Sequence, residues 1–102
     1  MREGYHIEFY PSQAVKSEGS WSNGKKEGKN FKEYNSEGNL MYIGGYRNNL
    51  RHGYGVEYHE NSAIKYEGQF FNGNHYGDAC KIMDKNSKAE YVGQIDQDGV
   101  KV

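Results

Sequence analysis

The residues with the most reactive side chains are His52, His75 and Cys80, and their spacing can be compared with two kinds of chemistry. A metal site needs three or four converging ligands, and no third ligand recurs beside the two histidines. A cysteine nucleophile needs a histidine held in place to activate it, and His75, five residues before Cys80 along part of one expected strand, does not supply that base. We therefore expect no metal, no cofactor and no catalytic residue, and we interpret Cys80 as a small apolar side chain, buried or half-buried.

Other enzyme signatures are missing from the sequence as well. It contains no Gly-rich phosphate loop, no nucleophile elbow and no repeated pair of carboxylates. The chain is therefore expected not to be an enzyme. If it belongs to a larger enzyme, the catalytic part lies outside these 102 residues.

The densest positive charge is a group of four lysines around the first expected turn: Lys25, Lys26, Lys29 and Lys32. Anionic phospholipid headgroups attract such groups by about 1 kcal/mol per charge near the membrane surface. Glu27 and Glu33 interrupt the cluster, and neither an amphipathic helix nor a lipidation motif accompanies it. Two interpretations stay open, a contact site for lipid and a hairpin tip exposed to water.

Length and charge exclude several classes of protein. The 102 residues fit a single domain, and 13 Lys and Arg against 14 Asp and Glu leave a net charge of -1, without the basic excess of nucleic-acid-binding domains. The longest apolar run, Leu40–Tyr46, is too short to span a bilayer, and the first residues lack the apolar segment of a signal peptide. With a single cysteine, we expect a reducing, cytoplasmic setting.

A repeat of 24 to 25 residues organises the chain. One glycine series has steps of 25, 24 and 25 residues, and a large side chain follows two positions after each member: Gly19 and Trp21, Gly44 and Tyr46, Gly68 and Phe70, Gly93 and Ile95. A second series, Gly4, Gly28, Gly53 and Gly77, has steps of 24, 25 and 24. Each copy contains two segments of alternating side chains around turn formers, at Asn23-Gly24, Asn48-Asn49 and Asn72-Gly73. This arrangement is typical of a β-hairpin.

Hairpins in series predict an all-β fold with almost no helix, because no stretch has a sustained period of 3.6 residues. We expect one elongated, twisted antiparallel sheet, solenoid-like, in which stacked hairpins stabilise each other and aromatic ladders supply the buried area. Glycine weakens the interior of a strand, so these glycines need a separate reason. The expected reason is space for a neighbouring aromatic ring to lie flat across the backbone.

This pattern resembles the MORN repeat (membrane occupation and recognition nexus), with consensus Tyr-x-Gly-x-Trp-x-x-Gly-x-x-x-Gly-x-Gly. The best match is Tyr42-Ile-Gly-Gly-Tyr-Arg-Asn-Asn-Leu-Arg-His-Gly-Tyr-Gly55, followed by residues 66–77. The copy at 17–28 begins with Ser17 in place of the leading tyrosine. The resemblance extends over one array, with a half repeat at 4–16, repeats at 17–41, 42–65 and 66–90, and a half repeat at 91–102. The half repeats favour a fragment of a longer array or a dimer.

The resemblance implies a noncatalytic scaffold that binds another protein along an aromatic-lined surface. Two compatible interpretations apply to the aromatic series: it is the core of a thin sheet, and one side of it is a groove for an extended or helical peptide. The residues of this series are Trp21, Tyr42, Tyr46, Tyr66, Phe70 and Tyr91. We expect such a scaffold in a cytoskeletal, ciliary or membrane-associated assembly, and homodimerisation through the open sheet edges is a further expectation.

Three alternatives of other classes stay open. The first is recognition of anionic phospholipid by the four lysines, which rising salt would abolish, whereas binding through aromatic side chains would persist. The second is a regulatory domain of a larger enzyme such as a kinase or a methyltransferase. The third is a cell-wall ligand module similar to choline-binding repeats, and the single Trp of this chain counts against it.

Overall fold

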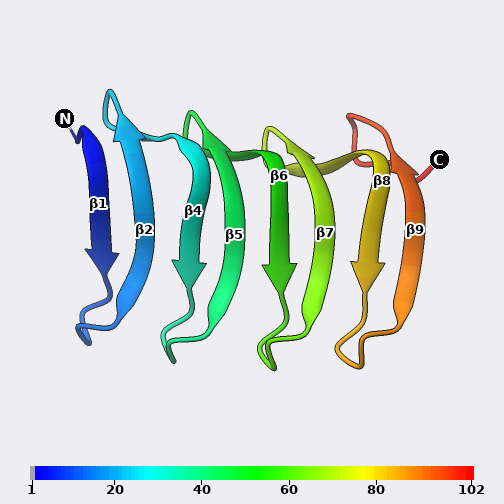
Figure 1. Cartoon of the computed structure of the whole chain (residues 1–102), viewed down its shortest axis with the longest axis horizontal. Helices are drawn as coiled ribbons and strands as arrows, with labels where there is room; N and C mark the ends of the chain where they lie inside the picture. The colour runs from blue at the N-terminus through cyan, green and yellow to red at the C-terminus, as the bar shows by residue number, and fades with distance from the viewer. Residues whose placement is uncertain (1) are drawn as a thin grey trace.

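A computed structural model describes residues 2–102, which form one open antiparallel sheet (Figure 1). The strands follow each other in chain order from β1 to β9, except that the two-residue β3 lies off this path and pairs with β2. The described residues contain no helix, so none that could cross a membrane, and the predicted all-β hairpin sheet is confirmed. The strands are β1 (Gly4–Phe9), β2 (Val15–Ser22), β3 (Lys25–Lys26), β4 (Gly28–Tyr34), β5 (Leu40–Arg47), β6 (Leu50–Tyr58), β7 (Ile64–Phe71), β8 (Asn74–Met83) and β9 (Ala89–Ile95).

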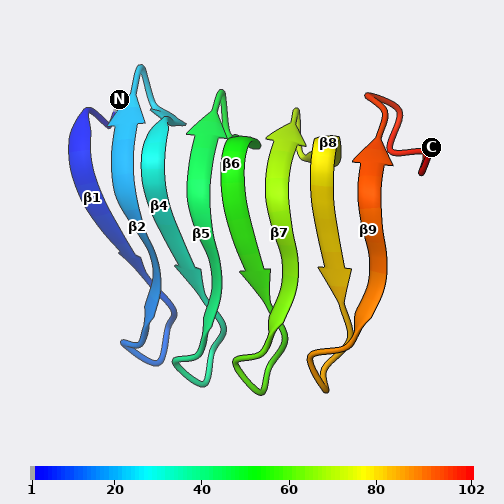
Figure 2. The same ribbon diagram turned by 45° about the vertical axis from the view of Figure 1, so that its right-hand side comes forward.

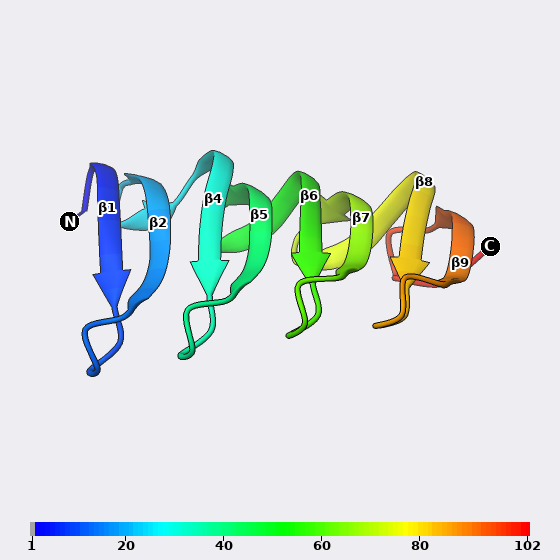
Figure 3. The ribbon, with the colours of Figure 1, turned by 60° about the horizontal axis from the view of Figure 1, so that its bottom comes forward.

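The sheet is elongated, with extents of 40 × 29 × 16 Å. Its strands bend along their length, as Figure 2 shows, and the hairpins follow one another along the long axis (Figure 3). The two chain ends lie at opposite ends of that axis, beside β1 and β9 (Figure 1).

Two kinds of turn alternate between the strands. The tight turns at Asn23-Gly24, Asn48-Asn49 and Asn72-Gly73 have positive φ at both residues, which Asn and Gly tolerate, and they confirm the predicted turn positions. The other turns are five residues long, as in the link from β4 to β5, where the Asn35 N–H donates to the Asn39 carbonyl at 2.9 Å. All tight turns lie at one end of the strands, and the longer turns that join two strands lie at the opposite end (Figure 1).

Strand register sorts the side chains into two faces, because neighbours along a strand point to opposite sides. Glu57 lies opposite both Tyr42 and Tyr66, and these residues define the inner face. Ile43 lies opposite Val56, and these two define the outer face. The buried hydrophobic core is entirely on the inner face and consists of Phe31, Tyr42, Tyr46, Tyr66, Phe70, Cys80 and Ile95. The predicted burial of Cys80 is therefore confirmed.

The strand glycines make room for the tyrosine rings of the inner face. A Cβ on Gly55 would lie 2.5 Å from the Tyr42 hydroxyl oxygen, and one on Gly68 would lie 2.7 Å from that of Tyr66. Each hydroxyl reaches across its glycine to donate to a carbonyl three residues further along the chain, at 2.8 Å for Tyr42 and 2.6 Å for Tyr66. The expected role is therefore confirmed for these glycines. It is not the role of the second glycine series, because a Cβ on Gly53 would meet nothing within 4 Å, and Gly28, Gly53 and Gly77 instead have positive φ of 118°, 83° and 118°.

Candidate functional site

A continuous aromatic ladder lies along the inner face and includes the residues that the sequence singled out. Successive ring centroids are 4.8–6.4 Å apart along the series Trp21, Phe31, Tyr46, Tyr42, Phe70 and Tyr66, most of them edge to face. Such geometry adds about 0.5–1.5 kcal/mol per pair beyond the area that is buried. Tyr91 packs against the same cluster from the side of β9.

Burial divides the six predicted partner-binding residues into two groups. Tyr42 and Tyr66 are fully buried, Phe70 and Tyr46 are nearly so, and all four belong to the core. Trp21 and Tyr91, toward the two ends of the ladder, stay half-buried. The Trp21 Nε1–H has no hydrogen-bond acceptor among the described residues although the atom is buried. Within this group, Trp21 and Tyr91 are therefore the ones that a partner can contact.

Phe31 is a member of the ladder that the sequence analysis did not single out. A Cβ on Gly19 would overlap the Phe31 ring, in the way that a Cβ on Gly55 would meet Tyr42. The first repeat has Ser17 where the others have their leading tyrosine, and Phe31 fills the space over its glycine instead. Alternation of Phe31 with Glu33 and Lys29 along one expected strand was the only available signal.

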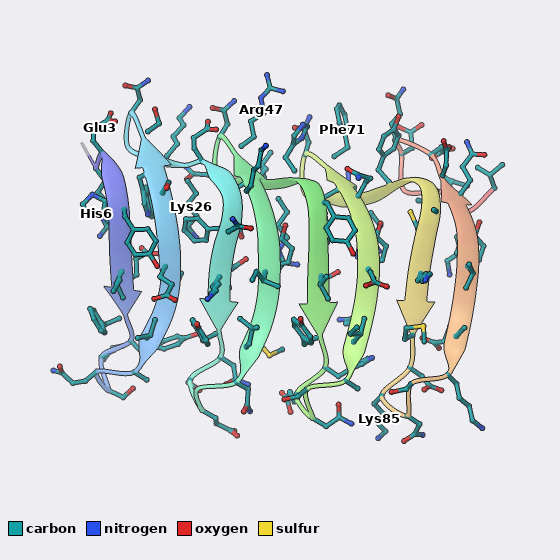
Figure 4. The ribbon with its side chains drawn as sticks, viewed as in Figure 1. Glu3, His6, Lys26, Arg47, Phe71 and Lys85 are labelled. Carbon is teal, nitrogen blue, oxygen red and sulfur yellow. The ribbon has the colours of Figure 1, made fainter. Side chains whose placement is uncertain are left out.

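A row of basic side chains lies over the aromatic ladder, and the sequence analysis missed it as well. Arg2, Lys26, Arg51 and His75 recur at steps of 24, 25 and 24 residues. The Arg51 guanidinium carbon lies 4.1 Å from the ring centroid of Tyr42, and the His75 ring stacks on Tyr66 at 3.6 Å and 1°. In Figure 4, Lys26 lies between β2 and β4, whereas Arg47 and Phe71 lie near the tight turns. The Lys26 Nζ is 5.3 Å from the ring centroid of Tyr46.

Three carboxylates, Glu8, Glu33 and Glu57, pair with this row. Arg51 bridges two of them, at 3.3 Å to Glu33 and 2.8 Å to Glu57. His75 Nε2 lies 2.5 Å from the second oxygen of Glu57. Glu8 forms ion pairs with Arg2 at 3.0 Å and with Lys26 at 3.9 Å. The charges of the inner face thus neutralise each other within the chain.

The surroundings set the protonation state of this network. Burial opposes ionisation of Glu57, but the hydrogen bond from His75 and the charge of Arg51 outweigh it and lower the Glu57 pKa. Burial raises the pKa of the Tyr42 and Tyr46 hydroxyls, and the neighbouring carboxylate of Glu33 adds to the effect. At neutral pH the Tyr42 and Tyr46 hydroxyls are therefore neutral and the Glu57 carboxylate is ionised.

The four lysines of the predicted lipid-contact cluster do not form one surface. Lys26 lies opposite Trp21 on the inner face, where Glu8 and the aromatic rings surround its ammonium group. Lys32 lies opposite Glu18 and Ile43 on the outer face, and Lys25 lies opposite Ser22 at the sheet margin. Lys29 lies between two hollows, one shared with residues of β5 and β6 and the other with residues of β1 and β2. Residues close in sequence are separated because a strand alternates its side chains between faces.

The reactive side chains do not converge either. Cys80 is fully buried and lies 3.1 Å from the Tyr66 hydroxyl oxygen, while His75 is turned to Glu57. Within residues 2–102 no group of three His, Cys, Asp or Glu side chains could hold a metal ion.

Comparison with known families gave one match. The model of the MORN repeat matches residues 18–29, 42–63 and 66–75. These segments contain the tight turns of three successive hairpins, including that of the copy that starts with Ser17. A search of curated proteins found none that matches.

Proposed function

The chain belongs to the MORN-repeat family, and from that premise we propose that it is a noncatalytic scaffold whose inner face binds a segment of another protein. The observation that carries the proposal is the half-buried state of Trp21 and Tyr91 on a one-layer sheet. No second layer of structure covers the inner face within the described residues, so the exposed parts of the Trp21 and Tyr91 side chains stay open to a partner.

The expected partner is an extended or helical peptide that lies along the ladder. Tyrosine and tryptophan suit such a surface, because they combine a large contact area with a polar tip and lose little conformational entropy. Since the charges of the inner face pair with each other, the peptide should contact it through apolar side chains and hydrogen bonds rather than through net charge. We place the scaffold in a cytoplasmic cytoskeletal, ciliary or membrane-associated assembly, or in the regulatory part of a larger enzyme.

The test is affinity capture of partners from native lysate with the full chain, at low and at high salt. The informative variant is Trp21→Ala with Tyr91→Ala, because these side chains lie on the inner face without being central to the core. Tyr5→Ala is the matched control, because Tyr5 is 63% exposed and lies opposite Ser20 on the outer face. We expect a discrete protein that is retained at high salt, lost with the double variant and kept with the control.

The phospholipid alternative predicts the opposite salt response. Vesicles with anionic headgroups would bind at low salt only, and Lys29→Glu with Lys32→Glu would abolish that binding while the Trp21 and Tyr91 variant keeps it. That result, together with no protein retained at high salt, would replace the scaffold proposal.

A further inference from the structure

One row of side chains crosses the whole outer face perpendicular to the strands, at one level along their length. Each member lies directly opposite the next in the strand register, so the row is continuous from β1 to β9. In order across the sheet, it consists of Ile7, Glu18, Lys32, Ile43, Val56, Glu67, Lys81 and Val92.

The chemistry of this outer row repeats every 49 residues, or two hairpin repeats, rather than every one. Ile7 corresponds to Val56 and Glu18 to Glu67, and the second half of each period repeats in the same way with a lysine and a branched apolar residue. The row therefore has apolar residues at its two ends and at its centre, with a Glu-Lys pair in each gap. Lys81 and Glu67 form one such pair, with 3.9 Å between the ammonium nitrogen and a carboxylate oxygen.

The charged and apolar residues of the outer row are complementary to those of the same row in reversed order. When the strand order is reversed, Glu18 faces Lys81, Lys32 faces Glu67, and every apolar residue faces another apolar residue. A two-fold axis parallel to the strands, between Ile43 and Val56, produces this reversal. It leaves the position of the row along the strands unchanged. Each Glu-Lys pair then meets a Lys-Glu pair of the other copy, so that every charge has two opposite neighbours.

We propose that the outer face is an interface between two copies of this chain, related by that two-fold axis. Isologous contact of this kind is the commonest symmetry of soluble oligomers, and the strands of the two sheets run along a common direction, as in aligned sheet packing. A two-fold axis along the row instead would place Glu18 over Glu18 and Lys32 over Lys32. The charge pattern therefore selects one of the two in-plane axes.

Exposure and area agree with a covered face. Val92 is 61% exposed and Ile7 is 45% exposed in the single chain, which is high for branched apolar side chains at the ends of such a row. The face measures 40 by 29 Å across its whole outline, and a stable interface of standard size buries about 800 Å² of each partner.

A hollow next to the axis completes the fit. Tyr54, 55% exposed on the outer face, stands beside a hollow of about 590 Å³ whose floor includes Gly28, Gly45 and Gly53. Gly45 lies on β5 next to Gly44, which is opposite Gly55 of β6, the neighbour of Tyr54. Rotation about the axis exchanges β5 and β6, so Tyr54 of each copy comes over Gly45 of the other. The pair of tyrosines would fill two symmetric hollows.

This dimer leaves both inner faces free and turned away from each other. It goes beyond the proposed scaffold function, because it does not depend on which protein binds the inner face. It also differs from pairing through the open strands β1 and β9, which would extend the sheet and leave the outer row exposed.

The test is sedimentation velocity on the full chain from about 1 µM to about 500 µM, a range that covers weak and moderate dimers. Two charge exchanges separate the pairs within a chain from those between chains. Variant one carries Glu67→Lys with Lys81→Glu, and variant two carries Glu18→Lys with Lys32→Glu. Each keeps its pairs within the chain and the net charge, but places four like-charged contacts across the proposed interface.

We expect the wild-type chain to dimerise and each variant alone to dissociate at least about a hundredfold more readily, because like charges in contact cost several kcal/mol. An equimolar mixture of the two variants should dimerise again, because every charge then meets its opposite. The matched control is Glu37→Lys with Lys85→Glu, an exchange on exposed long turns, which should dimerise like wild type.

Circular dichroism and the thermal midpoint check that the variants fold. If a charge exchange disturbs folding, Val92→Glu provides a second probe, because its side chain is at the exposed end of the row. A wild-type chain that stays monomeric throughout the concentration range overturns the proposal. So does a dimer that is indifferent to the charge exchanges and to Val92→Glu, since its interface would then lie elsewhere, at the sheet edges or on the inner face.

Discussion

The ring of Phe31 lies against Gly19, at a position where any Cβ on that glycine would overlap it. In the two following repeats the ring over the equivalent glycine belongs to Tyr42 or Tyr66, from the strand that carries the glycine itself. The first repeat therefore keeps the packing of ring on glycine although it has Ser17 in place of the tyrosine. The ring comes from the next strand, β4, instead.

This substitution predicts a specific rescue. Phe31→Ala should lower the free energy of unfolding by about 3–5 kcal/mol, because it empties a buried aromatic site. Adding Ser17→Tyr should recover part of that loss, because the consensus tyrosine would then cover Gly19. Denaturant unfolding of the single and double variants measures both effects. If Ser17→Tyr destabilises the Phe31→Ala chain further, a tyrosine at position 17 does not fill the space that the Phe31 ring leaves over Gly19.

A second prediction concerns the close approach of Gly55 and Tyr42. Gly55→Ala should destabilise the chain by about 1–3 kcal/mol, because the new Cβ would lie 2.5 Å from the Tyr42 hydroxyl oxygen and force the ring to move. In a Tyr42→Phe background the same change should cost less, because the nearest of the three close contacts is gone, although the ring carbons at 2.7 and 2.9 Å remain. A double-mutant cycle measures this coupling. Equal losses of stability in the two backgrounds would mean that the Tyr42 hydroxyl is not what excludes a side chain at position 55.

A third prediction concerns the stability of the fold at low pH. The Glu57 pKa is lowered in the folded chain, because His75 and Arg51 outweigh the effect of burial. A carboxylate with a depressed folded pKa stabilises the fold above its unfolded pKa and loses that contribution as the pH falls through the folded value. Stability should therefore fall below about pH 4.5, the ordinary range of a glutamate. The Glu8 pKa is lowered too, where burial is outweighed by hydrogen bonds from Ser17 and Arg2, so Glu8 adds to the same loss.

The Glu57→Gln variant isolates the contribution of that carboxylate. It should be less stable than wild type at neutral pH, and the difference should shrink as both chains are acidified. Glu90→Gln is the matched control, because Glu90 is exposed on β9. Denaturant midpoints measured from about pH 7 to pH 3 make the comparison. A constant difference between wild type and Glu57→Gln at all pH values would contradict the linkage.

The fold and its faces could be predicted from sequence, because glycine and aromatic residues mark every hairpin directly. The spacing of Gly44 and Tyr46 gives the strand, and alternation gives the face. The lysine cluster shows the limit of that reading. Lys25 and Lys26 are neighbours in sequence, yet β3 turns their side chains to opposite faces.

The row of basic side chains could not be predicted for a related reason. Lys26, Arg51 and His75 occupy equivalent positions, each two residues before a glycine of the second series. Their different side-chain types conceal the repeat, and nothing in one sequence shows which glutamate each will meet. Phe31 was missed because it compensates for Ser17 from another strand, and only the register reveals that the two share one space.

The fourth prediction tests how Arg51, a member of the row of basic side chains, holds the inner face together. Arg51 binds Glu33 and Glu57 at once while its guanidinium lies 4.1 Å from the Tyr42 ring centroid. Arg51→Met should lower stability by about 3–5 kcal/mol, because it leaves two half-buried carboxylates without their shared cation. Arg51→Lys should recover only part of this, because a single ammonium cannot reproduce a planar fork that stacks on a ring and reaches two carboxylates.

The charge and shape contributions of Arg51 can be separated by unfolding experiments at several salt concentrations. Partly buried pairs are screened little, so the loss in Arg51→Met should persist at high salt. Arg47→Met is the control, because Arg47 is exposed near a tight turn and has no ion pair among the described residues. If Arg51→Lys matches wild type, the site needs only a positive charge. If Arg51→Met also matches it, the network does not stabilise the fold, and the aromatic ladder alone holds the inner face.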